Sequence, residues 1–372
     1  MLRVHHIAIA GAGLAGLAAS IAAANAGVRV DLFEHAGCVA PMPAHIDVVP
    51  NLVRDLAALG VAEACLQRCF AYQGMAVVDA EGRTIDTIPT PNLAGARLPA
   101  AFGMVYGDLL GVLLAAAEAR GVRVHWRAGL RSAQVHGAQV QAVTGDGAEW
   151  QGDLLVLAGA SNVAGVEQPL QDRFVSLPQC WDFVLLPRPQ AIERSTWVIG
   201  AAGRKALVVP VDVARVGVAC LRDERAHRTA DQVTAAALRD RLAGGGPLLA
   251  AIGSALPPDA PVIGRPVRFG LLEGPWHAGA ALRIGSSAHL LPPHFGQAAA
   301  QSMEDAVVLG DLLREGLGRT GLLATFTARR AHRAALVHAI TAQAARWDLE
   351  PTPTTDLQAL ARALAPIVAQ AA

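Results

Sequence analysis

The stretch Gly11-Ala12-Gly13-Leu14-Ala15-Gly16 decides how the rest of the chain is interpreted. It follows a short apolar run at residues 5–10 and opens an alanine- and leucine-rich run that reaches residue 26. The first run predicts a strand and the second predicts a helix. A second predicted strand covers residues 28–33, and Glu34 ends it. The predicted order is therefore strand, glycine turn, helix, strand and acid.

The glycines of this turn have separate tasks. Gly11 permits the tight turn, Gly13 lets a backbone N–H group approach a pyrophosphate, and Gly16 lets helix and strand pack closely. The start of the helix, at Leu14 and Ala15, offers unpaired N–H groups to an anion. We therefore predict that these five residues form a dinucleotide site. The alternative is a tight turn from strand to helix that binds no ligand.

Glu34 restricts which dinucleotide fits. Its carboxylate stands about twenty residues after the glycines, where it accepts hydrogen bonds from the hydroxyls of an adenosine ribose. The same negative charge repels a 2′-phosphate. The slot therefore suits FAD or NAD, and it does not suit NADP.

Composition and charge exclude several classes of protein. The 372 residues are 53% hydrophobic, which predicts a globular chain of two domains or one elaborated domain. Lys and Arg number 31, as do Asp and Glu, so no overall charge recruits nucleic acid or anionic lipid. No apolar stretch is long enough for a membrane span, and no basic segment precedes the first apolar run as in a signal peptide. We expect no nucleic-acid or membrane partner.

The five cysteines show neither the spacing of a metal site nor the density of a disulfide scaffold. We therefore expect a cytoplasmic protein without a bound metal. Cys65 and Cys69 lie one helical turn apart if that segment is helical. Buried packing is the preferred interpretation of this pair, and a metal or redox pair is the alternative.

The pattern along the chain predicts an α/β fold with an inserted sheet. A hairpin is expected at 74–89, four antiparallel strands between 174 and 221, and a proline-rich return at 257–266. Asn51 is expected to cap a helix, and the apolar run 153–158 to lie centrally in a parallel sheet. Helices are expected at 108–120, 231–242, 297–313 and 325–347, with a last one at the end of the chain.

A second constellation of motifs occupies residues 276–306. It contains Ile284-Gly285-Ser286, the loop Pro292-Pro293-His294-Phe295-Gly296-Gln297, and Glu304-Asp305-Ala306. Together with the first glycine motif, it resembles the second FAD signature of the class A flavoprotein aromatic hydroxylases, the fold of the p-hydroxybenzoate hydroxylase type. The resemblance covers nearly the whole chain.

This resemblance implies a Rossmann-like FAD-binding domain of the glutathione-reductase type, an inserted mixed and antiparallel β-sheet substrate domain, and C-terminal helices. The FAD-binding domain is expected at 1–72, 99–172 and 263–318, the substrate domain at 73–98 and 173–262, and the C-terminal helices at 319–372. Further cofactor contacts are then expected from Tyr106, Leu130, Ser286, Pro293, Gly296 and Gln297. Open N–H groups at Gly296 and Gln297 would stabilise negative charge on a reduced flavin.

The departures from the family pattern all fall on the flavin side. They are Ser286 in place of aspartate, Gly159-Ala160 in place of Asp-Gly, Tyr106 in place of arginine, Ala298 in place of glycine, and Pro43-Ala44-His45 in place of a glycine-rich loop. Three lost polar contacts amount to roughly 3 to 4.5 kcal/mol, which weakens FAD binding by about 10²- to 10³-fold. We therefore expect FAD to dissociate during purification.

The activity implied by the resemblance is that of a monooxygenase. NAD(P)H would reduce the flavin, oxygen would add at its C4a atom, and an aromatic or polycyclic small molecule would be hydroxylated or epoxidised. His45 and His294 are the best-placed titratable groups, although each is equally typical of a satisfied loop histidine. Substrate contacts are expected from Trp181, Phe183, Trp197 and Arg204, although strand aromatics are usually core.

A second interpretation remains open from the sequence. The replaced acids are also typical of a degenerate family member that binds flavin weakly or not at all. Such a protein would act in binding or in a non-redox isomerisation or cyclisation. The sequence allows either a monomer or a homodimer.

Overall fold

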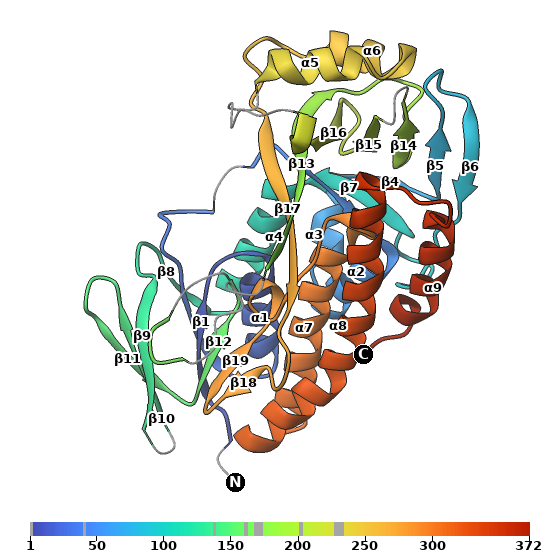
Figure 1. The fold of residues 1–372 in the computed structure, drawn as a ribbon. Coiled ribbons are helices and arrows are strands. Elements are labelled where there is room, and N and C mark those ends of the chain that lie inside the picture. The colour runs from blue at the N-terminus through green and yellow to red at the C-terminus, as the bar shows by residue number, and fades with distance from the viewer. Residues whose placement is uncertain are drawn as a thin grey trace.

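The computed structural model describes residues 3–39, 42–136, 139–159, 163–166, 174–200, 204–226 and 234–372 (Figure 1). Its first sheet has the strand order β18-β19-β12-β1-β2-β8. The strands are β1 (His6–Ala10), β2 (Arg29–Phe33), β8 (Arg123–His125), β12 (Leu154–Leu157), β18 (His277–Ala278) and β19 (Ala281–Arg283). β12 pairs in parallel with both β1 and β19, which confirms that the apolar run predicted at 153–158 lies centrally in a parallel sheet.

Alternation along β1 decides what covers this sheet. Ile7 and Ile9 point into the core formed with the helices, whereas Ala8 and Ala10 pack toward a second, three-stranded sheet. The helices are α1 (Leu14–Asn25), α4 (Tyr106–Glu118) and α7 (Gln297–Arg314), and the small sheet consists of β9 (Leu130–His136), β10 (Gln139–Thr144) and β11 (Glu149–Gly152). The described elements of the domain are thus arranged in three layers, as expected for an α/β nucleotide-binding fold.

The larger sheet has the order β20-β17-β13-β16-β15-β14-β5-β6. Its strands are β5 (Met75–Val78), β6 (Thr84–Ile88), β13 (Val175–Pro187), β14 (Thr196–Ile199), β15 (Lys205–Pro210), β16 (Arg215–Asp223), β17 (Ile263–Leu271) and β20 (His289–Leu290). The predicted hairpin and the four predicted strands are all present. Two helices, α5 (Ala235–Ala243) and α6 (Pro247–Ser254), pack their buried side chains against this sheet.

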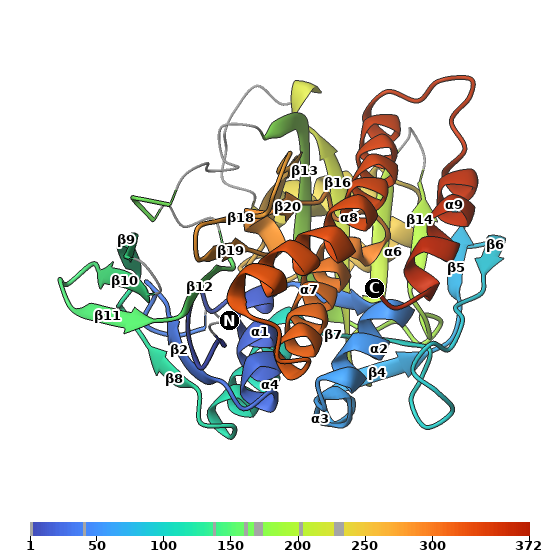
Figure 2. The same ribbon diagram turned by 90° about the horizontal axis from the view of Figure 1, so that it is seen from below.

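A third sheet joins the two larger ones. It consists of β3 (His45–Val48), β7 (Ala101–Val105) and β4 (Cys69–Tyr72), in the order β3-β7-β4. The helices α2 (Pro50–Ala58) and α3 (Ala62–Leu66) lie beside it in the chain, and α8 (Arg319–Leu349) and α9 (Leu357–Ala369) end the protein. Figures 1 and 2 show β9 to β11 on one side of the molecule and the hairpin β5–β6 on the other, with α7 and α8 side by side between them.

Several predicted details of the elements are wrong. Asn51 does not cap α2: the helix begins at Pro50, whose fixed φ suits that position, and Val49 is the N-cap residue. Cys65 and Cys69 do not share a helix, because Cys69 lies in β4. All five cysteines are free thiols.

Two elements were not foreseen in the proline- and glycine-rich stretch that follows α5. The end of the predicted return, residues 263–266, and the residues up to 271 form strand β17, which pairs with β13 in the larger sheet. Helix α6 follows the triple glycine and starts on Pro247. Of the Gly159-Ala160 pair, only Gly159 lies in the described residues. No helix in the described part of the chain is both long and apolar enough to span a bilayer.

Candidate functional site

A cavity of about 800 Å³ lies at the carboxyl ends of β1, β2 and β12. Ligands of open α/β sheets bind at this edge of the sheet. The predicted cofactor residues that line it are Gly11, Gly13, Leu14, Ala15, Glu34, Tyr106, Leu130 and Ser286. The structure therefore brings together residues that are up to 275 positions apart in the sequence, from Gly11 to Ser286.

The three glycines of the first motif have different surroundings. Gly11 has φ +104°, a backbone conformation that side chains rarely adopt. A Cβ atom on Gly16 would lie 1.8 Å from the Gly11 carbonyl oxygen, so this position must be glycine for the helix to pack. A Cβ atom on Gly13 would meet nothing within 4 Å of protein. Gly13 therefore leaves open space for a ligand, whereas Gly16 serves the packing.

Glu34 closes the adenosine end of the cavity. Its Oε2 atom accepts a hydrogen bond from the Ala12 N–H group at 2.7 Å, and its Oε1 atom accepts one from Ala36 at 2.9 Å. A carboxylate has room for about four hydrogen bonds, so capacity remains for ribose hydroxyls. The donors and acceptors present thus fit an adenine dinucleotide.

The N-terminus of α7 forms the other end of the cavity. Phe295 and Gly296 both adopt left-handed conformations, with φ of 58° and 67°, and no side chain caps the helix. The predicted donors Gly296 and Gln297 are not open, because the Gly296 N–H donates to the Pro293 carbonyl at 3.3 Å and the Gln297 N–H donates to the His294 carbonyl. The donors that can face a bound group are those that follow in the first turn of α7, and the helix dipole favours negative charge there. The cavity wall at this end includes Ala298 and Ala299.

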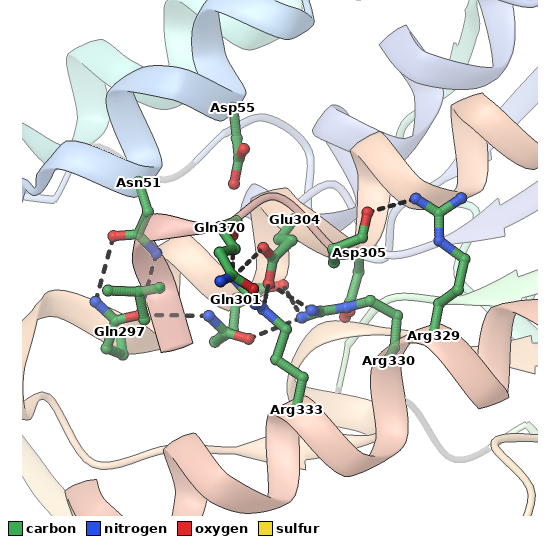
Figure 3. Close-up of polar contacts among 12 residues, drawn as sticks. Asn51, Asp55, Gln297, Gln301, Glu304, Asp305, Arg329, Arg330, Arg333 and Gln370 are labelled. Carbon is green, nitrogen blue, oxygen red and sulfur yellow. Dashed lines mark hydrogen bonds and ion pairs between the residues drawn. The ribbon is translucent and has the colours of Figure 1, made fainter. Parts of the chain in front are cut away.

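Gln297 contributes differently from the prediction. Its side chain is buried and bonds to the amide of Asn51, with Nδ2 to Oε1 at 3.2 Å, instead of lining either cavity (Figure 3). The Oε1 atom of Gln297 also accepts a hydrogen bond from the Gln301 side chain at 3.3 Å. Gln297 thus fixes the start of α7 to helix α2, and its backbone N–H donates to the His294 carbonyl.

A buried ionic network holds the flavin-side loop in place (Figure 3). Arg330 is fully buried and forms ion pairs with Glu304 and, at 2.7 Å, with Asp305. The other oxygen of Asp305 accepts the Gly285 N–H at 2.8 Å and lies 2.7 Å from His289 Nε2. Burial alone raises the pKa of Asp305, but His289 and Arg330 outweigh it and hold that pKa at about 2. Asp305 therefore stays ionised and anchors the backbone beside Ser286.

A second cavity, of about 190 Å³, adjoins the first. Tyr106, Ala298 and Ala299 belong to the walls of both cavities. The remaining predicted residues that line the second cavity are His45, Trp181, Phe183, Trp197, Pro293, His294 and Gly296. These residues come from β3, β13, β14 and the loop before α7, so the larger sheet forms one wall and β3 with that loop forms the other.

The prediction for Arg204 is not supported. Its guanidinium donates a hydrogen bond to the Gly244 carbonyl at 3.0 Å, beside α5, and Arg204 lines neither cavity. An arginine in a polar turn carries no sequence information on which way it points. The packing of α5 against the sheet decides its position.

His294 is held by a carboxylate on α8. Its Nε2 atom lies 2.9 Å from Asp348 Oδ2, and Lys205 Nζ lies 2.5 Å from the other oxygen of Asp348. Burial by itself raises the pKa of Asp348. His294 and Lys205 lower this pKa by more than burial raises it, so the pKa of Asp348 lies below its ordinary value. The Nδ1 atom of His294 has no hydrogen-bond partner among the described residues.

His45 has a different environment. Burial alone lowers its pKa to about 4, so the ring is neutral at physiological pH. A Cβ atom on Gly217 would lie 2.4 Å from His45 Nδ1, so the ring rests directly on that glycine of β16. His45 therefore cannot supply positive charge to the cavity near neutral pH.

Sequence reasoning missed Asp47, Tyr72, Ser195, Lys205 and Asp348. Asp47 follows His45 by two residues in β3, and this alternation would have placed both side chains on one face. No comparable pattern marks Asp348, which stands 54 positions from its partner His294. Only the docking of α8 brings them together.

Comparison with known proteins agrees with this geometry. A family model described as an FAD binding domain matches residues 5–153. Over 356 residues the chain is 26% identical to YetM of Bacillus subtilis (strain 168), assigned as an FAD-dependent monooxygenase, and the match covers 94% of this chain and 95% of YetM. The chain is thus similar over most of its length to an FAD-dependent monooxygenase, and its N-terminal part matches the FAD binding domain family.

Two further matches cover most of the chain. The FAD-dependent urate hydroxylase of Klebsiella oxytoca is 25% identical over 350 residues, which cover 87% of this chain and 85% of the hydroxylase. The crystal structure of Klebsiella pneumoniae HpxO with FAD and uric acid has a TM-score of 0.77 at 21% identity and covers 98% and 97% of the two chains. The shared fold confirms the expected architecture, and FAD is the cofactor of this family. The alternative of a flavin-free binding protein receives no support.

Proposed function

We propose that this monooxygenase hydroxylates or epoxidises a small aromatic compound in the 190 Å³ cavity, with NAD(P)H as reductant and O₂ as oxidant. The observation that carries the proposal is the shared wall of the two cavities, formed by Tyr106, Ala298 and Ala299. FAD, when bound, supplies the hydride acceptance and oxygen transfer that side chains lack. The residues of this chain bind the substrate, orient it, exclude water and move a proton.

The aromatic walls of the smaller cavity favour a flat, unsaturated substrate. Trp181 and Trp197 meet edge to face with ring centroids 5.7 Å apart, and Phe183 lies 5.6 Å from the ring of His45. Rings of this kind offer apolar faces and edges against which an aromatic ligand can pack. The volume is below the 300–1,000 Å³ of drug-sized sites, which favours one or two fused rings. Urate, the substrate named for the Klebsiella relative, is of this size class.

His294 is the proposed proton acceptor. Because the ionised Asp348 accepts the Nε2–H of His294, the neutral ring keeps its lone pair on Nδ1. A substrate hydroxyl placed in the cavity can pass its proton to this atom, and Asp348 then stabilises the imidazolium. Deprotonation makes a phenolic ring electron-rich at the position that receives oxygen. Lys205 and Asp348 act as positioning residues in this scheme.

The N-terminus of α7 is proposed to stabilise the cofactor when it carries negative charge. The N–H groups of its first turn belong to Ala298 and Ala299, which line both cavities. Preorganised donors of this kind act without reorganisation during reaction. The ionic network of Arg330 and Asp305 holds the loop beside them.

Location and assembly are proposals of the same kind. We propose a cytoplasmic protein, because its five cysteines are all free thiols. The oligomeric state is proposed to be a monomer or a homodimer. Cell fractionation and size-exclusion chromatography with light scattering test these two points.

The proposed activity is tested by oxygen consumption. The protein is soaked with FAD, desalted and assayed with NADH or NADPH and a panel of phenols and heteroaromatic alcohols. We expect at least one aromatic to stimulate NAD(P)H oxidation with incorporation of oxygen into the product. If none does, while the visible spectrum shows bound FAD, the proposed function is wrong.

His294→Asn tests the proposed acceptor. We expect a decrease of about 10²- to 10³-fold in kcat, because a general base contributes a factor of this order. The absorbance of a bound phenol reports whether the phenol is ionised. We expect the ionisation of the bound phenol to occur at a higher pH in this variant than in the wild type. The exposed His332 gives a matched control, and His332→Asn should leave both readouts unchanged.

A further inference from the structure

Asp47 occupies an unusual position in the wall of the smaller cavity. Tyr72 donates its hydroxyl to Asp47 Oδ1, and Ser195 donates its hydroxyl to Oδ2 at 2.7 Å. The three residues come from β4, β3 and the turn before β14, so the carboxyl group sits where the two domains meet. Both carboxyl oxygens are held, and the orientation of the group is fixed.

The fixed carboxyl group still has free acceptor positions. Two of its roughly four lone pairs are taken by the hydroxyls of Tyr72 and Ser195. Asp47 lies on the same face of β3 as His45, borders the cavity and is only partly covered, although it lies deep in the molecule. Burial raises its pKa, although the two hydroxyls oppose the shift. Asp47 can therefore accept a hydrogen bond from a ligand in the cavity.

Besides His45 Nδ1, whose ring rests against Gly217, two further polar groups of this cavity lack partners. Trp181 is 3% exposed and His294 is 5% exposed, and both line the cavity. Neither Trp181 Nε1 nor His294 Nδ1 has a hydrogen-bond partner among the described residues. An indole N–H can only donate, whereas the Nδ1 atom can accept because Asp348 fixes the other ring nitrogen. Buried polar atoms without partners cost free energy, which a complementary ligand recovers.

Cationic groups are absent from the described lining of this cavity. Lys205 is committed to Asp348, and the guanidinium of Arg265 is turned to the Met42 sulfur, with Nη2 and Sδ 3.1 Å apart, at an exposed position. The described lining thus offers a carboxyl group and an acceptor nitrogen but no cationic side chain that could form an ion pair with an acid. Burying an unpaired carboxylate there would be costly.

From this arrangement we infer that the substrate is an uncharged aromatic that donates hydrogen bonds to Asp47 and His294 and accepts one from Trp181. Such a compound carries a hydroxyl or ring N–H together with a carbonyl group, and it lacks a carboxylate. The inference rests on the proposed function and names the substrate class of the same site. Asp47 then acts as a specificity-determining residue.

The inference is tested with ligands that differ only in charge. Salicylamide is compared with salicylate, and 3-hydroxy-2-naphthamide with 3-hydroxy-2-naphthoate, by isothermal titration of the FAD-saturated protein. We expect each amide to bind about 10- to 100-fold more tightly than its carboxylate, the factor for an uncompensated buried charge. A carboxylate that binds as tightly as its amide overturns the inference, and so does the failure of both amides to bind.

Two variants test the assigned contacts. Asp47→Asn removes the acidic group, and we expect the preference for the amides to shrink by about tenfold. Trp181→Phe removes the N–H donor, and it should weaken the carbonyl-bearing naphthamide more than 2-naphthol, which has no carbonyl. Asp146→Asn makes the same charge change in a distant turn and should leave every ratio unchanged. If Asp47→Asn behaves like Asp146→Asn, the role assigned to Asp47 is wrong.

The two proposals fail in different ways. Discrimination between amide and carboxylate without any NAD(P)H oxidation would contradict the proposed function and leave the binding inference standing. Aromatic-stimulated oxidation with a preference for carboxylates would contradict the inference and leave the proposed function standing.

Discussion

Replacing Arg330 by methionine should strongly destabilise the protein. Arg330 is fully buried and is the partner of two buried acids, Glu304 and Asp305. Breaking a buried ion pair from one side costs about 3 to 5 kcal/mol, because the remaining charge is left without compensation. Glu304 keeps Arg54 and Arg333 within 3.1 Å and 2.9 Å, so the main loss falls on Asp305.

This loss of unfolding free energy can be converted into a decrease in melting temperature. An unfolding entropy of about 0.8 kcal/mol/K for a chain of this length gives a decrease in Tm of about 4 to 6 °C. The pH dependence gives a second readout. The pKa of Asp305 is about 2, below its ordinary value of 3.8, so its contribution to stability is present above about pH 4 and is lost as the pH falls toward 2.

Without Arg330, the pKa of Asp305 rises, and the carboxyl group takes up a proton at a higher pH. The difference in unfolding free energy between wild type and Arg330→Met should therefore shrink as the pH falls from about 7 to about 4. Urea unfolding followed by circular dichroism at several pH values measures this difference in unfolding free energy. Arg329→Met is the matched control, since Arg329 is 30% exposed and 3.9 Å from Asp311, and it should cost below about 1 kcal/mol. A deficit for Arg330→Met that is equally small, or that does not change with pH, would refute this reasoning.

Three further predictions concern the cofactor and the proton acceptor. Ser286→Asp should tighten FAD binding by about tenfold, the value of one recovered polar contact. Fluorescence titration with FAD measures this affinity, and an unchanged affinity would contradict the assignment of Ser286 to the ribityl chain. Gly13→Ala should leave Tm within about 1 °C but weaken FAD at least about tenfold, whereas Gly16→Ala should destabilise the fold itself, because its Cβ would overlap the Gly11 carbonyl. Asp348→Asn should lower kcat by about 10- to 100-fold with little change in KM and should shift the pH profile of kcat, because Asp348 no longer fixes which nitrogen of His294 accepts the proton. A change in KM alone would argue against this role of Asp348.

The nucleotide site could be predicted from the sequence for a local reason. The turn at Gly11 and Gly13 and the acid Glu34 belong to one strand–turn–helix–strand unit, whose spacing fixes where the glycines and the carboxylate lie. The alternation of apolar residues likewise predicted the inserted sheet, because one face of each strand is buried. These features depend on neighbours in the chain and need no knowledge of distant contacts.

The chemistry of the second cavity required the folded molecule. Ser195 reaches Asp47 across 148 positions, and Asp348 reaches His294 across 54. The partners of a buried polar side chain depend on how sheets and helices dock, and no periodicity encodes that docking. For the same reason Arg204 and the side chain of Gln297 were assigned to the site although they point elsewhere. Sequence thus determined the cofactor and the fold, whereas tertiary packing alone decided which groups line the second cavity.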